Sequence, residues 1–372
     1  MSVIGNTALR LDDEQAMLLD YARSFCAEKG LGHARAHLET EREYDPALWS
    51  EIVDMGWTGI GLPPARGGAG LGIGAAVPVL ESMGRVLMGT PLLSSLLAAQ
   101  LLRRAEDDAA AEVLASIASG QAASVAELES EDWLSTRTHT TLDSAGRLHG
   151  EKRLVADACS ARWIVVTARR GEQALLAVVD AHKLPGDALR TRVMIDHTHR
   201  AADLVLQGVA PHRVLAGAAV PAARRDYRLL GALLIAAEST GAAAACLDTT
   251  VEYLKTRKQF GQLIGSYQAL KHPSVDILNR IDAAKSFIYH AATLVGDAAL
   301  GREQEIACRM AKAQATETLK FAADRAIQFH GGMGFTWDCD AQLFDRRAQW
   351  AQQQFGDAQH HRRQLGALLL DG

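Results

Sequence analysis

The chain has 372 residues, a net charge of −5 and a hydrophobic fraction of 48%. This length is sufficient for two or three domains, and the composition is that of a globular protein rather than a disordered one. The charge balance argues against a nucleic-acid-binding protein. No unbroken apolar run reaches roughly 20 residues, the length that a membrane-spanning helix needs, and the first residues lack the features of a secretory signal. We therefore expect a cytoplasmic protein without a membrane span.

The residues that could bind metal or form disulfides show no organised spacing. Five cysteines are widely spread without a CxxC pair, which predicts reduced thiols. The histidines also lack metal-ligand spacing, so we expect no metal site.

Residues 1–118 are predicted to form a helical domain. Apolar residues recur there at helical spacing, and the Gly- and Pro-rich stretch 61–72 predicts a loop. The expected helices are Leu11–Lys29, Ala47–Met55, Ile73–Met88 and Leu92–Arg104.

The rest of the chain changes from strands back to helices. Residues 119–222 contain short β-branched runs that predict a small antiparallel sheet or barrel, and residues 223–372 predict a four-helix bundle. The expected strands include Trp163–Ala168, Ala174–Val179 and Leu204–Leu206. The expected bundle helices are Tyr227–Thr256, Tyr267–Leu300, Glu303–His330 and much of Ala341–Leu370. This order indicates an α+β fold with an inserted sheet domain.

One face of the first bundle helix carries a carboxylate among small and apolar residues. Residues three or four positions apart share a helix face. The residues of this stripe are Leu230, Leu234, Glu238, Gly241 and Ala245. Burial disfavours a charged carboxylate and raises its pKa, which suits a base that removes a proton from carbon.

The alternative is that Glu238 pairs with an arginine across the bundle, such as Arg325 or Arg347. The pattern supports the two interpretations about equally. The small residues from Gly241 to Ala245 leave room for a ligand and favour the base slightly.

Two helix ends could hold a phosphate-bearing ligand. In the run 257–261, the Arg257 guanidinium can fork onto two phosphate oxygens, and Phe260 offers an aromatic face. The run 328–335 is a second helix end followed by glycines. Either run alone could be a simple helix stop, but together they indicate a site for a phosphate-bearing ligand.

These runs resemble the signature of acyl-CoA dehydrogenases, and the likeness extends over essentially the whole chain. The similar stretches are 56–59, 63–72, 81–91, 257–272, 328–338 and 343–347. The resemblance implies an N-terminal helical domain, a middle β-barrel-like domain and a C-terminal four-helix bundle. It also implies α,β-dehydrogenation of an acyl-CoA thioester, in which a carboxylate removes the α-proton and the β-hydride passes to FAD. An electron-transferring flavoprotein is the expected electron acceptor.

The resemblance further implies that FAD is bound non-covalently between subunits. The FAD contacts expected from one subunit are Arg257 and Phe260, with Gln268 nearby. The contacts expected from the partner subunit are Gln328, Gly331 and Gly332. The assembly would be a homodimer, a homotetramer, or a heterotetramer with a related chain.

The chain departs from the family pattern at the catalytic base. The two usual base positions hold Gly231 and Gly356 instead of a carboxylate, and Asp357 is a fallback one residue further on. The run 236–241 resembles a bacterial branch that acts on CoA thioesters of steroid side chains, and there the base would be Glu238.

The β-domain departs as well. The stretch 124–130 lacks the family's Thr-Glu-x-x-x-Gly-Ser-Asp segment, and 150–156 lacks the Trp and Thr expected near the flavin. Two alternatives therefore accompany the dehydrogenase: a non-catalytic partner subunit of a heteromeric enzyme, and a flavin oxidase or monooxygenase. Small residues such as Gly231 and Ala232 indicate a roomy groove, so the acyl group could be bulky. The resemblance implies a role in fatty-acid or steroid catabolism.

Overall fold

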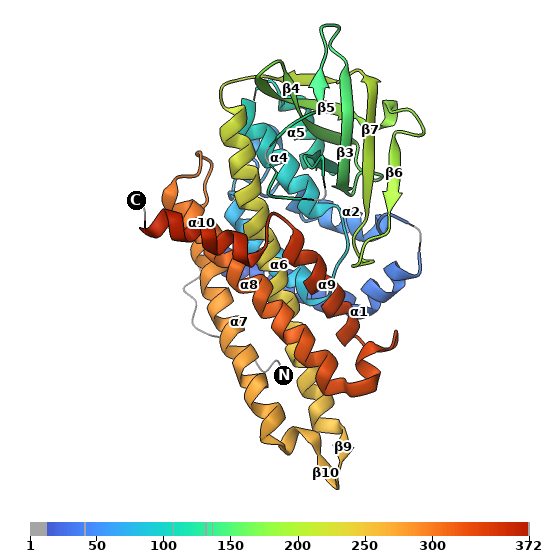
Figure 1. The fold of residues 1–372 in the computed structure, drawn as a ribbon, viewed down its shortest axis with the longest axis vertical. Helices are drawn as coiled ribbons and strands as arrows, with labels where there is room; N and C mark the ends of the chain where they lie inside the picture. The colour runs from blue at the N-terminus through green and yellow to red at the C-terminus, as the bar shows by residue number, and fades with distance from the viewer. Residues whose placement is uncertain (1–12, 41, 107, 131, 136, 371–372) are drawn as a thin grey trace.

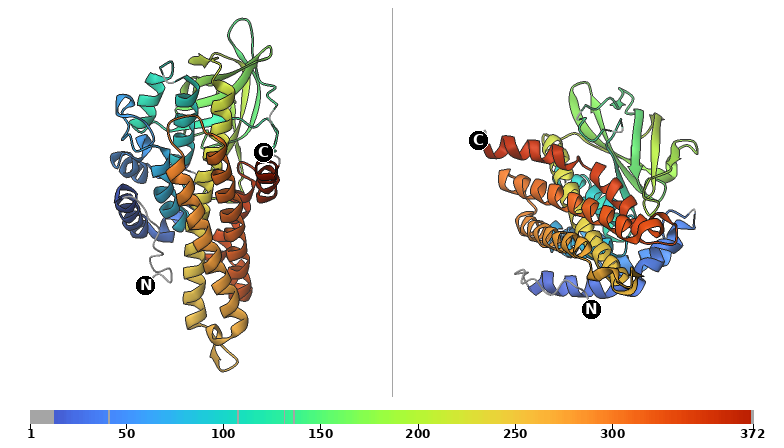
Figure 2. Two further views of the ribbon diagram at one scale, coloured as in Figure 1. Left: turned by 90° about the vertical axis from the view of Figure 1, so that its left-hand side faces the viewer. Right: turned by 60° about the horizontal axis from the view of Figure 1, so that its bottom comes forward.

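The computed structural model describes residues 13–40, 42–106, 108–130, 132–135 and 137–370. Its elements follow the predicted order of helices, sheet and helical bundle (Figure 1). Figure 2 shows the N-terminal helices against one side of the bundle and the sheet at one end of it. The predicted α+β class is confirmed.

The N-terminal part consists of helices and short turns. The helices are α1 (Asp13–Leu38), α2 (Pro46–Asp54), α3 (Ala76–Arg85), α4 (Leu92–Glu106) and α5 (Ala111–Ala118). Helix α1 continues past the predicted end at Lys29, with a kink at Gly30, where φ is 60°. Helix α5 had no counterpart in the prediction.

The middle part is an open mixed sheet rather than the expected barrel. Its strands are β1 (Ala123–Ala126), β2 (Thr141–Leu142), β3 (Leu148–Ala156), β4 (Trp163–Arg170), β5 (Gln173–Asp180), β6 (Leu189–Arg192), β7 (Ala201–Val209) and β8 (Arg213–Leu215). The order is β6-β7-β3-β2-β4-β5-β8, with β1 beside β4. Within the described residues the edge strands β6 and β8 do not pair, so the sheet does not close. The pairs β1–β4 and β2–β4 are parallel, which makes the sheet mixed rather than antiparallel.

The C-terminal part is a bundle of long helices. Its elements are α6 (Val220–Thr256), the hairpin β9 (Lys258–Gln259) and β10 (Gln262–Leu263), α7 (Gln268–Leu294), α8 (Arg302–His330), α9 (Ala341–Gln353) and α10 (Ala358–Leu370). The single final helix that we expected is broken between α9 and α10. Phe355 and Gly356 have φ values of 57° and 95° there, and this left-handed backbone cannot continue a helix.

Helix α6 is the axis of the bundle. It contacts α3, α4, α7, α8 and α9. In the described part of the chain it is the one helix long and apolar enough to cross a membrane, and its apolar window is entirely buried in the protein. The core helix of a globular protein passes the same test of length and apolar composition.

Helices α3 and α6 cross at unusually short range through two glycines. A Cβ atom added to Gly241 would lie 1.8 Å from the carbonyl oxygen of Glu81, and one added to Gly84 would lie 2.0 Å from that of Glu238. The absence of side chains at these positions therefore sets the distance between the helices.

Replacing Gly241 with alanine is expected to lower the free energy of unfolding by about 1–3 kcal/mol, because the helices must separate to relieve the overlap. Gly366 in α10 is the matched control, since a Cβ there meets nothing within 4 Å. Its replacement by alanine is expected to stabilise the protein by roughly 0.5–1 kcal/mol. Urea denaturation followed by circular dichroism measures both, and equal effects of the two substitutions would contradict the close crossing.

Candidate functional site

An inner cavity lies between α4, β1, β3, α6 and α9. Its lining consists of Leu93, Ser94, Leu97, Ser124, Val125, Glu127, Leu128, Trp133, Arg153, Leu154, Ala156, Tyr227, Ile235, Trp350, Gln354 and Phe355. Most of these side chains are apolar, so the cavity suits an apolar or flat aromatic group. Leu154 and Ala156 belong to the stretch 150–156, which lacks the family's Trp and Thr.

Aromatic rings fill the space beside the two usual base positions. A Cβ atom added to Gly231 would lie 2.4 Å from ring carbons of Phe355, the residue before Gly356. The Phe355 ring also packs against Trp133, with 4.3 Å between the ring centroids. A carboxylate side chain at position 231 would therefore have to displace Phe355.

Glu238 is ion-paired, as the alternative interpretation of the sequence proposed. Its Oε1 accepts a hydrogen bond from Nη1 of Arg347 at 2.5 Å, whereas Arg325 pairs with Asp324. Glu238 is 5% exposed and is not among the residues that line the inner cavity. Its role as the base stays a prediction.

Arg347 is the centre of a buried polar cluster. It is fully buried, and its Nε donates to Asp196. Its Nη2 donates to Oγ1 of Thr198 at 2.6 Å, and Thr198 in turn donates to Asp196 at 2.7 Å. The loop between β6 and β7 therefore supplies two of the three hydrogen-bond partners of this arginine. Sequence reasoning missed these loop residues, because nothing in their local pattern distinguishes them.

The carboxylates of this cluster have pKa values shifted in opposite directions. Burial raises the pKa of Glu238, against the attraction of Arg347. Burial also acts to raise the pKa of Asp196, but the nearby Arg347 and His199 and the hydrogen bonds from Arg347 and Thr198 outweigh it and lower that pKa to about 2. Asp196 is thus the firm counter-ion of Arg347, and Glu238 is the carboxylate that takes up a proton more readily.

His199 connects this cluster to the wall of the inner cavity. Its ring stacks on Trp350, with 3.7 Å between the centroids, and its Nε2 lies 3.9 Å from Oε1 of Glu238. Burial and the nearby Arg347 lower the pKa of His199 to about 3, so the ring is neutral at physiological pH. Glu238 therefore lies behind Trp350 rather than in open contact with the cavity.

The fallback residue Asp357 has a structural role. It is exposed, and its Oδ1 accepts a hydrogen bond from the backbone N–H of His360 at 2.7 Å at the start of α10. This is the position and contact of a helix N-cap. Asp357 does not line the inner cavity.

The two dinucleotide motifs lie at one end of the bundle in the same chain (Figure 1). The helices α6 and α8 end side by side there, where Tyr253 stacks on His330 with 4.2 Å between the centroids. Leu254, Ile264 and Phe329 form a small apolar cluster beneath them. Both motifs therefore lie at the same end of the chain, and their expected division between two subunits stays a prediction.

The exposed surface at this end, which we call the FAD platform, comprises Arg257, Phe260, Gln268, Gln328, Gly331 and Gly332. No other described residue hydrogen-bonds or ion-pairs with the Arg257 guanidinium, and Phe260 is 92% exposed. Cβ atoms added to either of the two glycines would meet nothing within 4 Å. A free guanidinium, an aromatic face and open backbone fit a diphosphate and an adenine ring.

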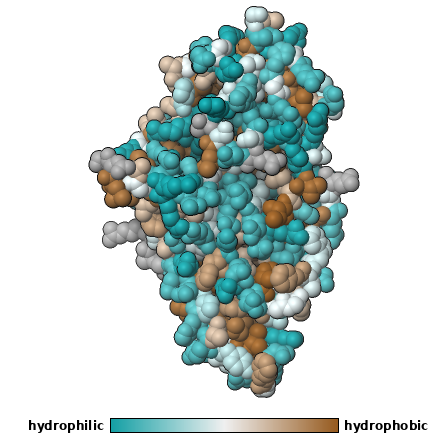
Figure 3. All heavy atoms as spheres, viewed as in Figure 1, coloured by the Kyte–Doolittle hydropathy of each residue, from teal (hydrophilic) through white to brown (hydrophobic). Residues whose placement is uncertain are grey.

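Large apolar side chains are also exposed near the platform, among them Met333, Phe335 and Trp337. Apolar residues gather over the lower part of the molecule in Figure 3. A surface of this kind is typical of a region that a ligand or another subunit covers.

Comparison with known proteins identifies the family. The models "Acyl-CoA dehydrogenase, N-terminal domain" and "Acyl-CoA dehydrogenase, C-terminal domain" match residues 12–121 and 229–370. Acyl-CoA dehydrogenase IpdE2 of Mycobacterium tuberculosis is 32% identical over 342 residues, which cover 90% of this chain and 91% of the relative. The chain belongs to the acyl-CoA dehydrogenase family, whose members are FAD-dependent oxidoreductases acting on CH–CH bonds.

Solved structures agree with this assignment. The Tcur3481–Tcur3483 steroid acyl-CoA dehydrogenase is 28% identical, with a TM-score of 0.83 over 97% of this chain and 98% of that one. A chain of the ChsE4–ChsE5 complex from Mycobacterium tuberculosis is 24% identical, with a TM-score of 0.85 over 97% and 98% of the two chains. The second likeness concerns the fold alone.

Proposed function

We propose that this chain contributes to the α,β-dehydrogenation of a bulky, steroid-type acyl-CoA as one of two related chains, and that the partner chain supplies the catalytic base. The observation that carries this proposal is that, among the residues that the structure describes, no free carboxylate lines the inner cavity. Glu127 is the one carboxylate that lines it, and it is held by Arg224 and Arg228. Bound FAD would supply the acceptor for the hydride, and an electron-transferring flavoprotein would take the electrons onward.

Two further points support the two-chain arrangement and the substrate class. All the residues expected to contact FAD are present in this chain, whereas both usual base positions are glycines. The similar Tcur3481–Tcur3483 enzyme is described as a steroid acyl-CoA dehydrogenase and carries the names of two chains. This chain would thus contribute contacts to FAD while its partner supplies the base.

The second candidate is an enzyme that works without a different partner chain and uses Glu238 as its base. The raised pKa of Glu238 favours it, because a base must hold its proton after abstraction. Arg347 would then have to release Glu238, and Trp350 would have to move to give it access to the cavity.

Anaerobic flavin reduction distinguishes the two candidates. The purified chain, with FAD, is mixed with straight, branched and steroid-bearing acyl-CoAs, alone and with a related chain that has a carboxylate at a usual base position. We expect bleaching of the flavin only with both chains, and the same rate with Glu238→Gln. If the chain alone bleaches FAD and Glu238→Gln slows this by about 10²–10⁴-fold, Glu238 is the base and the two-chain proposal is wrong.

A further inference from the structure

Two aromatic side chains, Trp133 and Phe355, separate the inner cavity from a second pocket, and we call them the aromatic wall. The second pocket lies between the loop after β1, the start of α6, and helices α8 and α10. The linings of both pockets include Trp133 and Phe355. The second pocket is also lined by Leu134, which is 44% exposed, so this pocket opens at the surface. The aromatic wall therefore lies between the surface opening and the inner cavity.

The rings of the aromatic wall pack on each other and on α6. The plane of the Trp133 ring is tilted by 40° from that of Phe355, and the Phe355 ring meets Tyr227 edge-on with 5.5 Å between the centroids. Tilted and edge-to-face pairs at such distances are favourable. Ring carbons of Phe355 also lie directly over Gly231, where even a single Cβ atom would overlap with them. The part of the expected groove beside Gly231 is therefore occupied by the Phe355 ring.

A buried lysine fixes the backbone turn that carries Phe355. This turn joins α9 to α10, and Phe355 has a left-handed backbone there, with a φ of 57°. The fully buried Lys312 of α8 donates to the backbone oxygen of Ala351 at 3.1 Å and to that of Gly356 at 2.8 Å, on either side of Phe355. The last carbonyl groups of a helix have no partner within the helix, so Lys312 supplies one at the end of α9. The position of the Phe355 ring is therefore set by the packing of the bundle as well as by its own rotamer.

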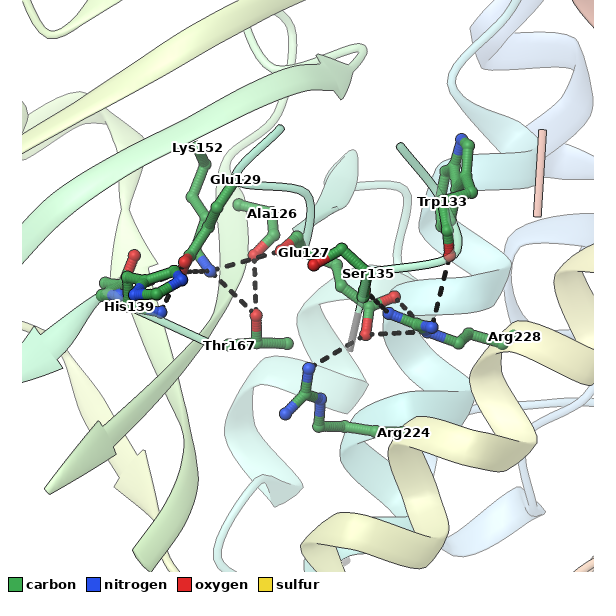
Figure 4. A network of polar contacts seen from close by, with 11 residues as sticks. Ala126, Glu127, Glu129, Trp133, Ser135, His139, Lys152, Thr167, Arg224 and Arg228 are labelled. Carbon is green, nitrogen blue, oxygen red and sulfur yellow. Dashed lines mark hydrogen bonds and ion pairs between the residues drawn. The ribbon is translucent and has the colours of Figure 1, made fainter. Parts of the chain in front are cut away.

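An arginine of α6 fixes the loop that carries Trp133. Arg228 donates to the backbone oxygen of Trp133 at 3.4 Å and to that of Ser135 at 3.0 Å (Figure 4). Its Nε lies 3.2 Å from both carboxylate oxygens of Glu127. A guanidinium has five donors in one plane, so a single arginine can bind a carboxylate and two carbonyl groups at once. Both halves of the aromatic wall are therefore anchored to bundle helices, Trp133 to α6 and Phe355 to α8.

This anchoring makes entry into the inner cavity from the second pocket unfavourable. An incoming group would have to part the two rings, which exposes apolar ring surface to water. It would also strain the hydrogen bonds that Arg228 and Lys312 make to the backbone on either side. A bulky group meets this cost before it gains any contact with the apolar cavity lining. The aromatic wall therefore selects against bulky ligands on this route.

We propose that Phe355 and Trp133 are specificity-determining residues that exclude the acyl group of the substrate from the inner cavity of this chain. The acyl group is then held by the partner chain, which supplies the base. The location of the acyl group in the partner rests on the proposed function, whereas the closure of the cavity by the two rings does not.

Ligand binding to the full-length chain, with FAD, tests the aromatic wall. The first probe is N-phenyl-1-naphthylamine, an uncharged aromatic dye that fluoresces in apolar surroundings. The second is a steroid-bearing acyl-CoA, compared with coenzyme A by calorimetry. The variants are Phe355→Ala and, on the loop side, Trp133→Ala. Phe321→Ala is the matched control, because Phe321 is also partly buried but packs against a different apolar cluster and lies outside both linings.

We expect Phe355→Ala to bind the dye about tenfold more tightly than the native chain, because it opens an apolar space beside Gly231. Trp133→Ala should act in the same direction, and its result decides if Phe355→Ala does not fold. Phe321→Ala should stay within about twofold of the native chain. The steroid-bearing acyl-CoA should bind the native chain no more tightly than coenzyme A does, and about tenfold more tightly than coenzyme A once the wall is opened.

Three results would overturn the proposal. The first is a native chain that binds the acyl-CoA much more tightly than coenzyme A. The second is dye binding that neither variant of the aromatic wall improves, and the third is an equal gain in Phe321→Ala. A closed cavity that opens in Phe355→Ala, in a chain that supports no dehydrogenation with any related chain, would support the aromatic wall while the proposed function fails.

Discussion

Replacing Arg347 with methionine is expected to lower the free energy of unfolding by about 3–5 kcal/mol. Methionine replaces the aliphatic part of the side chain but leaves two carboxylates, Asp196 and Glu238, without their buried counter-ion. An unpaired charge in the protein interior is far more costly than a lost surface ion pair. Because the cluster joins α6, α9 and the β6–β7 loop, its loss should loosen the contact between the sheet and the bundle.

The stability deficit of Arg347→Met should depend on pH. In the native protein Asp196 has a pKa of about 2, below the value of about 3.9 in an unfolded chain. The contribution of Asp196 to the free energy of unfolding is therefore fully present above about pH 4 and is lost as the pH falls towards 2. Without the arginine, burial would raise the pKa of both carboxylates, and protonation would relieve their repulsion. The difference between the native protein and the variant should thus be largest above about pH 5 and shrink in acid.

Urea denaturation at several pH values between 3 and 8 measures this effect. Arg346→Met is the matched control. Arg346 precedes Arg347 in the chain but is only half-buried, and it donates hydrogen bonds to Gln342 and to the backbone oxygen of Ile195. The control should lose about 1 kcal/mol or less, with little dependence on pH. A similar loss in both variants would mean that the buried cluster adds no stability of its own.

The features that depend on local sequence could be predicted, and those that depend on distant pairs could not. The stripe on α6 identified Glu238 as a buried carboxylate, because its spacing is set by one helix. The choice between Arg325 and Arg347 as its partner depends on the rotation of α8 and α9 about their axes, which no local pattern fixes. Asp196 was unpredictable for the same reason, since it lies 151 positions from Arg347.

The sheet domain shows the same limit. Strands β4 and β5 are apolar runs and were predicted, but β3 carries Glu151, Lys152 and Arg153 in its middle. These charges fit a strand because Lys152 reaches Glu129 and Arg153 reaches Asp203, partners supplied by other segments. The break between α9 and α10 was missed because a left-handed Phe355 is rare, although Gly356 beside it gave a signal.

Replacing Arg257 with alanine is expected to weaken FAD binding by the assembled enzyme by about 10- to 100-fold. A hydrogen-bonded pair of guanidinium and diphosphate contributes about 1.5–3 kcal/mol, and each 1.4 kcal/mol is about a factor of ten. The fold should be unaffected, because the Arg257 side chain is exposed and bonds to no other described residue. Fluorescence titration with FAD measures the affinity, and Arg257→Lys should lie in between, because lysine keeps the charge but loses the fork.

Lys258→Ala provides the control for charge alone, since Lys258 is the adjacent exposed cation in the β9–β10 hairpin. We expect it to change FAD affinity by about twofold at most. An equal loss of FAD affinity in Lys258→Ala and Arg257→Ala would contradict the assignment of Arg257 to the diphosphate of FAD, because any exposed cation of the hairpin would then serve as well.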